Sequence, residues 1–307
     1  MSGISTNRTN ITLPADISSE IIQKTQDESA VMRLARRVNV PGRGMVIPMI
    51  TSDPEAAWVA ETGAKPKSNP GLSTKTMTPY KLAVIVPFSD EFARDYAALY
   101  DALVARIPGA LAKKFDATVF NGSAPGSGFD VLTACTAQSI DVTSGGGGIY
   151  RALVAADIDI AAHDGDIDGF ALSPQCRGEL LSALDSDGRP IFINNVAEGA
   201  IPRLLGQPAY YSRGLYFAGN AASGNSGSSG YVAAKADVLG FAGDWTKAMY
   251  GTVEGVKIDI SNQATLTISD TAVNLWEHNM FAVKAEIEVG FVADATCFNK
   301  IVRTHAA

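Results

Sequence analysis

Alternation of apolar and polar residues near the start of the chain predicts a long hairpin with a solvated tip. Apolar side chains recur at every second position from Leu82 to Phe88, the period of a strand with one buried face. Residues 45–50 form a short apolar strand that leads into the hairpin, and residues 56–59 supply its first arm. Between the arms, residues 65–71 are rich in proline, glycine and lysine, a composition typical of turns. The expected second arm runs on to Phe88.

This hairpin has two interpretations, because its tip offers almost nothing apolar to bury. It is either an ordinary surface hairpin of one compact domain or an arm that lies on a neighbouring subunit. The second interpretation predicts a role in assembly rather than in chemistry.

The first segment with helical spacing covers residues 14–38, where apolar residues recur three and four positions apart. We expect helix there, with a polar break at residues 26–29, ended by the proline and glycines that follow. Three basic residues fall on what would be its solvated face: Arg33, Arg36 and Arg37.

A second segment with apolar residues at spacings of three and four predicts a long helix over residues 97–121. Proline removes a backbone donor and clashes with the preceding turn, so Pro108-Gly109 should kink or split this helix. Gly122 is the expected C-cap. Ser89 is the candidate N-cap of a preceding helix start, because two acidic residues follow it.

The second half of the chain contains short regular elements between glycine-rich loops. Helical spacing predicts a helix over residues 149–160, and residues 169–172 are expected to form a short buried strand. Ser173-Pro174 has the pattern of a helix start with proline in the first turn. Residues 281–291 alternate between apolar and mainly charged positions and predict the clearest strand of the sequence.

Composition narrows the class of protein. The chain has 307 residues, 46% hydrophobic and 19% charged, so it can bury a sizeable core in one large domain or two smaller ones. Its net charge of −7 argues against a dedicated nucleic-acid binder, which needs a basic face. The three cysteines are far apart and odd in number, which indicates buried thiols in a reducing compartment. Without a signal-peptide pattern or an apolar run of about 20 residues, we expect a soluble cytosolic protein with no membrane partner.

The best candidate for metal chemistry is the acidic segment 164–169, which has the spacing of the first half of an EF-hand loop. The twelfth position of that loop is Gln175, whose amide cannot supply the bidentate carboxylate, so we interpret the segment as an acidic turn. His163 stands next to Asp164, but no serine elbow or activated cysteine accompanies it. We therefore expect no catalytic residue, no metal and no cofactor.

The hairpin, the long helix and the strand-rich end together resemble the major capsid protein family of tailed phages, with its Hong Kong 97-like fold. The resemblance rests on the order and spacing of several stretches over roughly residues 14–302, and no single motif decides it. The stretches are residues 56–68 and 78–95 for the family's extended loop and its return strand, 113–128 for the end of the spine helix, 169–192 and 199–212 for the axial domain, and 242–251 and 274–301 for the closing strands.

The resemblance implies an α+β fold with an axial domain, a peripheral domain with a long spine helix, an extended loop and an N-terminal arm. The expected boundaries are residues 1–30 for the arm, 31–50 and 85–130 for the peripheral domain, 51–84 for the extended loop, 131–264 for the axial domain and 265–307 for the peripheral closing strands.

The resemblance also implies assembly. Pentamers and hexamers of this chain would form an icosahedral shell around double-stranded DNA, assembled in the host cytoplasm and carried in the virion. Portal and scaffold or decoration proteins would be further partners, and contact with DNA would be weak and non-specific because the chain is acidic.

Two features of some family members are not expected here. One is a long N-terminal scaffold segment, because the arm pattern begins near residue 1; the segment is absent, already removed or replaced by a separate scaffold. The other is a cross-link between a loop lysine and an asparagine of a neighbour. Lys65, Lys67 and Lys75 lie in the right loop, but neither an acceptor asparagine nor its assisting glutamate can be matched residue by residue, so no cross-link is predicted.

The extended loop carries the expected contacts between subunits. Trp58 would dock on the adjacent subunit while Lys65 and Lys67 pair with its acidic surface; the alternative is that Trp58 packs within its own sheet. The full set of expected contact residues is Trp58, Glu61, Lys65, Lys67 and Lys75.

One sequence must fit both five-fold and six-fold positions of such a shell, so some segments must bend. The expected places are Pro108-Gly109 and the loops 122–128, 145–148 and 219–230.

Two other functions stay open: an encapsulin-type compartment that encloses protein cargo, and a cytosolic hydrolase that uses His163 and a nearby acid.

Overall fold

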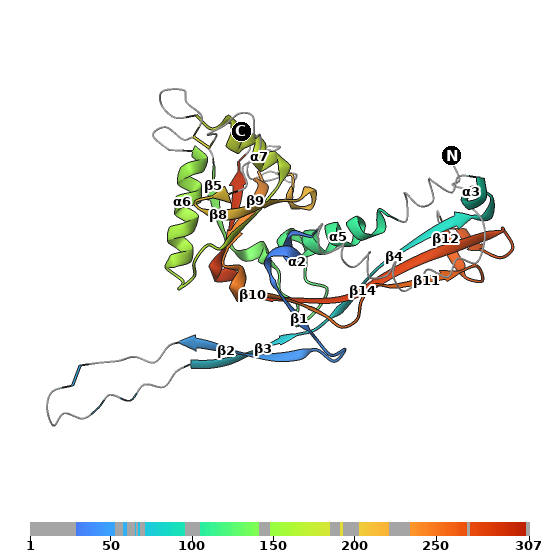
Figure 1. Cartoon of the computed structure of the whole chain (residues 1–307), viewed down its shortest axis with the longest axis horizontal. Coiled ribbons are helices and arrows are strands. Elements are labelled where there is room, and N and C mark those ends of the chain that lie inside the picture. Colours follow the sequence, from blue (N-terminus) through green and yellow to red (C-terminus); the bar gives the residue numbers. More distant parts are fainter. Residues whose placement is uncertain are drawn as a thin grey trace, which may run out of the picture.

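Two bodies and a projecting hairpin make up the computed structural model of this chain. One body is a long sheet with a helix lying along it, the other is a six-stranded sheet flanked by helices, and the hairpin extends away from both (Figure 1). The structure describes residues 29–52, 58–59, 65, 67, 71–95, 105–140, 148–184, 191–192, 203–220, 234–268 and 271–304.

Strand β14 (Met280–Ala293) is the centre of the long sheet and is paired along both edges. β4 (Tyr80–Ser89) runs antiparallel to it along one edge. β11 (Lys257–Ser261) and β10 (Ala248–Thr252) pair in succession with the other edge, also antiparallel. β1 (Arg36–Asn39) then adds to β10 in parallel. One long strand therefore sets the register of the whole sheet.

Alternation of side chains places one face of this sheet in the core. Alternate residues of β14 from Phe281 to Phe291 are buried, and β4 follows the same period. The Phe88 and Phe281 rings stack where the two strands pair, with centroids 5.7 Å apart. The strand predicted over residues 281–291 and the alternation up to Phe88 are confirmed.

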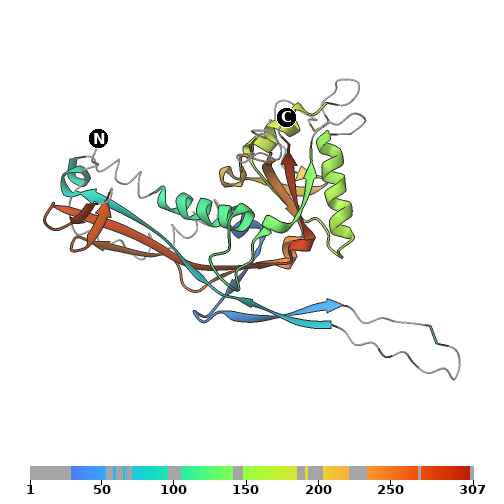
Figure 2. The ribbon, with the colours of Figure 1, turned by 180° about the vertical axis from the view of Figure 1, so that it is seen from behind.

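Helix α5 (Ile107–Asn121) lies along the apolar face of the long sheet (Figure 2). Its side chains Leu111, Phe115 and Val119 are buried against that face, as the helical spacing predicts. Gly122 is the C-cap, as expected, and its backbone N–H donates to a carbonyl of the last turn.

The sequence predicts that Pro108-Gly109 kinks or splits the helix, and among the described residues Pro108 lies at the start of a helix instead of bending one. Pro108 lies in the first turn of α5, where its missing backbone donor would have had no partner inside the helix. The proline therefore marks a helix start within the described residues. Part of the helix predicted over residues 97–121 lies outside them, since residues 96–104 are not described.

The helix predicted over residues 14–38 is wrong at its C-terminal end. Helix α2 (Ala30–Leu34) ends before Arg36 and Arg37, which belong to β1 and not to a solvated helix face. Pairing with β10 overrides the local helical pattern there. The part of the prediction before residue 29 lies outside the described residues.

A buried carboxylate joins α2 to α5. Asp116 of α5 accepts hydrogen bonds from Ser29 Oγ at 2.6 Å, from the Ala30 backbone N–H at 2.9 Å and from the Val31 N–H at 3.4 Å. These donors surround the N-terminus of α2, where the helix dipole favours a negative charge. Burial nevertheless disfavours the charged form and raises the pKa of Asp116 to about 6, although the three hydrogen bonds act in the opposite direction.

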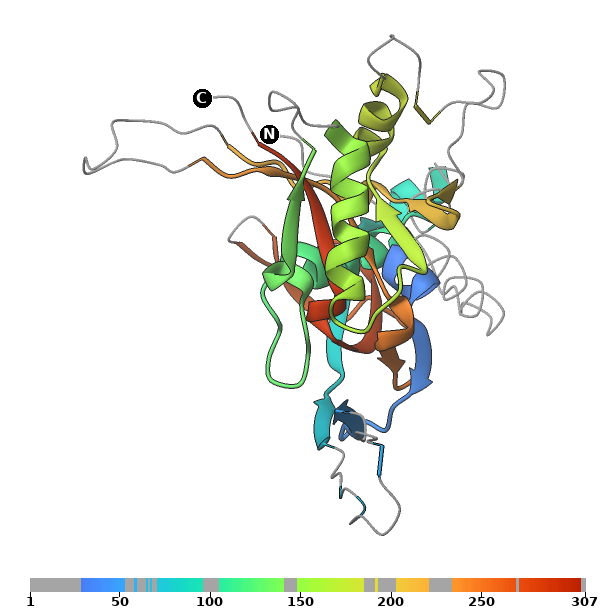
Figure 3. The same ribbon diagram turned by 90° about the vertical axis from the view of Figure 1, so that its left-hand side faces the viewer.

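The second body is a sheet with the strand order β5-β15-β9-β6-β8-β7. Helix α6 (Gly148–Ala161) packs over β5 and β15 and stands in front of the sheet in Figure 3. Helix α7 (Pro174–Ser182) follows β6 directly. The strands are β5 (Thr136–Ser139), β6 (Gly169–Leu172), β7 (Arg203–Leu204), β8 (Gln207–Tyr211), β9 (Asp237–Gly243) and β15 (Phe298–Arg303).

Three local predictions for this body are confirmed. α6 buries the apolar stripe of residues 149–160, and β6 is buried at every position. The Ser173 hydroxyl accepts a hydrogen bond from the Cys176 N–H at 3.1 Å, so Ser173 caps α7 with Pro174 in the first turn.

Two 3-10 turns carry the chain between the bodies. β9 leads through Trp245–Lys247 into β10, and β14 leads through Ala295–Cys297 into β15. An aspartate precedes each turn, Asp244 or Asp294, and its carboxylate accepts a hydrogen bond from the backbone N–H two residues on. Both connections thus use the same local cap.

The two turns also bind each other. The Asp244 N–H donates to the Cys297 carbonyl at 3.1 Å, and the Asp294 N–H donates to the Lys247 carbonyl at 3.3 Å. We call this pair of reciprocally bonded turns the crossover joint.

Small elements complete the described chain. α3 (Asp90–Asp95) begins directly after Ser89 and has two acidic residues in its first turn, as expected. No helix among the described residues is long and apolar enough to cross a membrane. The remaining elements are the hairpin strands β12 (Thr265–Ile268) and β13 (Thr271–Asn274) and the 3-10 turns Leu132–Ala134 and Arg213–Leu215.

The raised pKa of Asp116 predicts that stability depends on pH. The folded subunit binds a proton at Asp116 between the ordinary pKa of 3.8 and about 6, whereas the unfolded chain does not. The stabilisation is therefore largest at acidic pH and is lost as pH rises through 6. We expect the stability of the wild type relative to Asp116→Asn to fall by about 2 kcal/mol between pH 4.5 and 7.5, measured by urea unfolding of unassembled subunits.

Asp157→Asn, at an exposed position of α6, is the matched control and should show no comparable change. An equal difference between wild type and Asp116→Asn at both pH values would contradict the argument.

Candidate functional site: the projecting hairpin and its base

Strands β2 (Met45–Ser52) and β3 (Gly71–Met77) pair antiparallel and form the hairpin that projects from the molecule (Figure 1). The strand predicted at residues 45–50 is confirmed. The predicted second arm is wrong in one respect, because it is divided at Thr78-Pro79. β3 pairs with β2, whereas the chain beyond this point becomes β4 and pairs with β14.

The base of the hairpin has a small core of its own. Val40, Ile47, Met77 and Val292 are buried together there. A ribbon of two strands is only marginally stable in water, so these contacts with the long sheet support the projecting part.

An ion pair fastens the same base. Lys75 Nζ lies 2.6 Å from Asp130 Oδ2 and donates to the Ala293 carbonyl at 2.7 Å. The Ala293 N–H donates to the same Asp130 oxygen at 3.0 Å. We call these three residues the loop latch. Lys75 was expected to contact another subunit, but the structure places its ammonium group in the latch of its own subunit.

The loop 122–128, one of the expected places of bending, is tied to this base. Gly128 has a φ of +77°, and its carbonyl accepts a hydrogen bond from the Thr78 N–H at 2.8 Å. A Cβ at Gly128 would lie 2.5 Å from Thr78 Oγ1, so the close approach requires glycine. The Tyr80 hydroxyl donates to the Ser127 carbonyl at 2.7 Å.

The distal part of the hairpin is exposed where it is described. Trp58 is fully exposed, and Val59, Lys65 and Lys67 are also exposed. Trp58 therefore does not pack within its own sheet, and that alternative is wrong. Glu61, the remaining expected contact residue, lies outside the described residues.

The acidic segment 164–169 forms a structural turn. Asp168 Oδ1 accepts a hydrogen bond from the Trp245 N–H at 2.8 Å, and the Asp164 carbonyl accepts one from Lys247 Nζ at 2.6 Å. In the part of the chain that the structure describes, no three His, Cys, Asp or Glu side chains gather in a way that could hold a metal ion.

The histidine and the cysteines that could serve in catalysis do not lie in a catalytic arrangement among the described residues. His163 is exposed, and its Nδ1 lies 2.8 Å from the Asp159 carbonyl oxygen. All three cysteines are free and buried, as predicted. Burial raises the pKa of Cys135 to about 11 and of Cys176 to about 12, so these two thiols stay protonated and unreactive near neutral pH.

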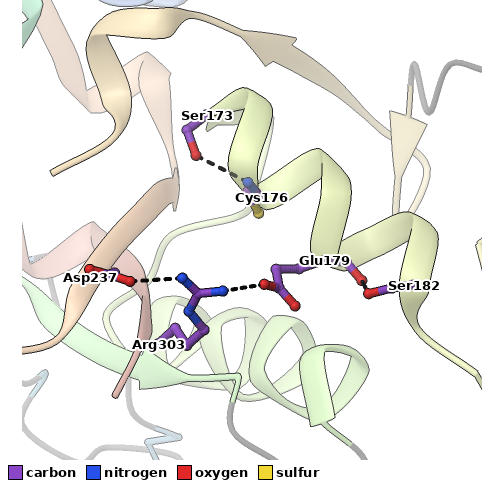
Figure 4. A network of polar contacts seen from close by, with 6 residues as sticks. All are labelled: Ser173, Cys176, Glu179, Ser182, Asp237 and Arg303. Atoms are coloured by element: carbon purple, nitrogen blue, oxygen red, sulfur yellow. Dashed lines mark hydrogen bonds and ion pairs between the residues drawn. The ribbon is translucent and has the colours of Figure 1, made fainter. Parts of the chain in front are cut away.

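A charged cluster at the end of β15 is not predicted by the sequence pattern. Arg303 binds Glu179 of α7 on one side and Asp237 Oδ2 at 2.9 Å on the other (Figure 4). Asp237 is only 1% exposed, and its second oxygen accepts from the Gly219 N–H at 2.7 Å. The planar guanidinium suits two carboxylates at once and fixes α7 to the sheet. No local sequence pattern predicts this cluster, because its members are far apart in sequence.

Comparison with known families decides the class of the protein. The phage capsid family matches residues 9–294. This chain belongs to the phage capsid family. Capsid proteins are structural components of the virion, so the predicted class is confirmed. The family is not an enzyme family, which removes the support for a hydrolase, and the match favours a phage capsid over an encapsulin-type compartment.

Known relatives of this capsid protein are major capsid proteins of phages. It is 26% identical over 292 residues to a probable major capsid protein of Mycobacterium phage D29, and the match covers 91% of this chain and 86% of the relative. It is 25% identical over 301 residues to the major capsid protein of Staphylococcus phage 80alpha, covering 95% and 85%.

Solved structures share the mixed helix and sheet fold of this capsid protein. A chain from Mycobacterium phage Bobi aligns with a TM-score of 0.70 at 20% identity over 91% of both chains. One from Gordonia phage Cozz aligns with 0.71 at 23% identity, over 91% of this chain and 87% of that one. The capsid of an empty GTA particle aligns with 0.62 at 14% identity, over 99% and 96%.

The loop latch predicts a local effect of Lys75→Met. This change keeps the length of the side chain but removes the ion pair. The pair is partly exposed, so the free energy of unfolding should fall by about 1 kcal/mol or less. Amide hydrogen exchange in β2 and β3 should nevertheless become faster, because the hairpin is less firmly held. Lys67→Met, in the exposed part of the loop, is the control. Unchanged exchange in both strands would show that the latch does not hold the hairpin.

Proposed function

We propose that this capsid protein is the major shell subunit of a tailed-phage head, in which pentamers and hexamers enclose double-stranded DNA. The observation that carries the proposal is the projecting hairpin, which is anchored at its base and bears a fully exposed tryptophan. A monomer gains nothing from such an arm, whereas a neighbouring subunit can bury it.

The parts of the structure suit the Hong Kong 97-like division. The long sheet with α5 corresponds to the peripheral domain and its spine helix, and the six-stranded body with α6 and α7 corresponds to the axial domain. The hairpin takes the place of the extended loop, with its latch in the peripheral domain. Residues 1–30, almost all outside the described part, would be the N-terminal arm.

The exposed loop residues supply a contact of ordinary strength. Complete burial of a tryptophan removes roughly 150–250 Å² from water, which is worth about 4–6 kcal/mol before the costs of association. Lys65 and Lys67 would pair with acidic surface of the neighbour, which suits a chain with a net charge of −7. One modest contact is enough, because a closed shell repeats it and the loss of any single subunit then requires breaking several contacts at once.

The acidic character of the chain supports enclosure of DNA without tight binding, since cations are needed to displace counterions from the phosphates. Portal and scaffold or decoration proteins would complete the particle, and assembly would take place in the host cytoplasm. The expected places of bending between five-fold and six-fold positions stay a prediction; among them, the loops 145–148 and 219–230 lie largely outside the described residues.

The test of the function is the size and content of the assembled particle. Sedimentation of the purified protein, expressed with a scaffold protein where one is required, should give a fast fraction in which electron microscopy shows rings or closed shells. Nucleic acid inside shells recovered from infected cells would support the phage head, and a co-purifying enzyme would favour a compartment for protein cargo. A discrete monomer or dimer at high concentration would contradict the proposal.

The loop contact is tested by Trp58→Ala and by deletion of residues 65–71. The Trp58 side chain is fully exposed, so Trp58→Ala should leave the unfolding of the subunit unchanged while it lowers shell yield. The deletion should block assembly. Trp276→Ala, at an exposed tryptophan outside the loop, is the matched control. Normal assembly of the deletion variant would show that the loop does not dock.

A further inference from the structure

Helix α6 has an apolar stripe on its outer face in addition to the stripe that it buries. Tyr150, Val154 and Ile158 follow one another at intervals of four residues, which places them on one side of the helix. Tyr150 is 47% exposed and Ile158 is 65% exposed, and Val154 between them is half-buried. Figure 3 shows α6 in front of its sheet. The exposed fractions of Tyr150 and Ile158 show that the stripe is accessible in the single subunit.

An exposed leucine at the tip of the β7–β8 hairpin is equally unexplained by its own subunit. Leu205 and Gly206 form the two-residue turn, with φ of +49° and +84°. Such a turn favours Asn-Gly or Gly-Gly, because a leucine disfavours positive φ. Leu205 is nonetheless 44% exposed, and a Cβ on Gly206 would meet no atom within 4 Å outside the turn itself. A strained, solvent-exposed leucine suggests a contact made outside the described subunit.

The outer stripe of α6 and the Leu205 turn lie at opposite edges of one sheet. α6 packs over β5 and β15, the first two strands in the order, whereas β7 is the last. A surface at one edge that receives a knob from the other edge makes a head-to-tail contact, and such contacts close into rings when the rotation between copies allows it.

Charge at the two sites is also complementary. Asp157 is exposed on the outer side of α6, three residues after Val154, and Arg203 is exposed two residues before Leu205. Among the described residues, neither Asp157 nor Arg203 has an ion-pair partner.

We propose that the outer face of α6 is covered by the β7–β8 turn of a second copy of this chain within a pentamer or hexamer. Leu205 of one copy packs on the Tyr150, Val154 and Ile158 stripe of the next, and Arg203 pairs with Asp157. This inference rests on the proposed shell function and specifies which surfaces join neighbours around the ring.

Charge reversal is the sharpest test. Arg203→Asp and Asp157→Arg should each lower the yield of rings and shells at least about tenfold, because each places like charges at the contact. The double variant restores an opposite pair and should recover assembly to within a fewfold of wild type. Single variants that assemble like wild type, or a double variant no better than the singles, would overturn the proposal.

Leu205→Asn separates folding from assembly. Asn-Gly suits this turn better than Leu-Gly, so the unassembled subunit should unfold at the same temperature as wild type or higher. Ring and shell yield should fall, since the apolar knob is gone. Leu205→Met keeps an apolar side chain and should retain assembly. Normal assembly of Leu205→Asn would contradict the proposed contact.

The outcome for wild type distinguishes this inference from the proposed function. Wild-type shells together with unaffected charge-reversal variants would refute the α6 contact alone. A wild-type chain that forms no ring or shell would refute the shell function itself.

Discussion

The crossover joint is the constraint on which the arrangement of the two bodies depends. β9 and β14 each end in a 3-10 turn, through which the chain passes into the other body. The backbone groups of the two turns form reciprocal hydrogen bonds. Both crossings begin with an aspartate cap, Asp244 or Asp294, whose carboxylate satisfies backbone donors that the turn would otherwise leave free. A change in the register of β14 would therefore shift the long sheet, the joint and β15 together.

Polar contacts between distant residues also connect segments that hydrophobic contacts alone would leave loosely oriented. Asp116 fixes the short helix α2 on α5, Arg303 fixes α7 on its sheet, and Lys75 fixes the hairpin on the end of β14. Asp116 and Asp237, the partner of Arg303, are buried and would be costly to leave unpaired, whereas the Lys75 pair is partly exposed. All three contacts specify an orientation in addition to adding stability. The projecting hairpin combines such a fixed base with an exposed distal part, which is the arrangement expected of an element that completes its packing on another subunit.

The sequence predicted correctly the elements that depend on interactions between residues close together in the chain. The period of residues 281–291, the spacing of residues 149–160 and the Ser173-Pro174 start all describe local chain geometry, and they appear where expected. The error at Arg36 occurs where distant residues decide, because Arg36 joins a strand that pairs with β10. Pro108 starts a helix for a local reason, since a proline in the first turn loses no hydrogen bond. The latch and the Asp116 cap join residues more than 50 positions apart, so no window of sequence contains them. One signal was present, since residues 240–246 and 290–296 share the pattern Gly-Phe-x-x-Asp-x-Thr of the two crossings.

The geometry of the two crossings determines how a subunit carries mechanical load. The path from β14 to β15 and the path from β9 to β10 run in opposite directions, and they are bonded to each other on both sides of the joint through the β10–β14 and β9–β15 ladders. A force that pulls the bodies apart acts on both crossings at once, because each body is joined to the other by two adjacent stretches of backbone. Separating the two bodies of one subunit would therefore require stretching two covalent connections side by side, so the load between the bodies is carried by continuous backbone.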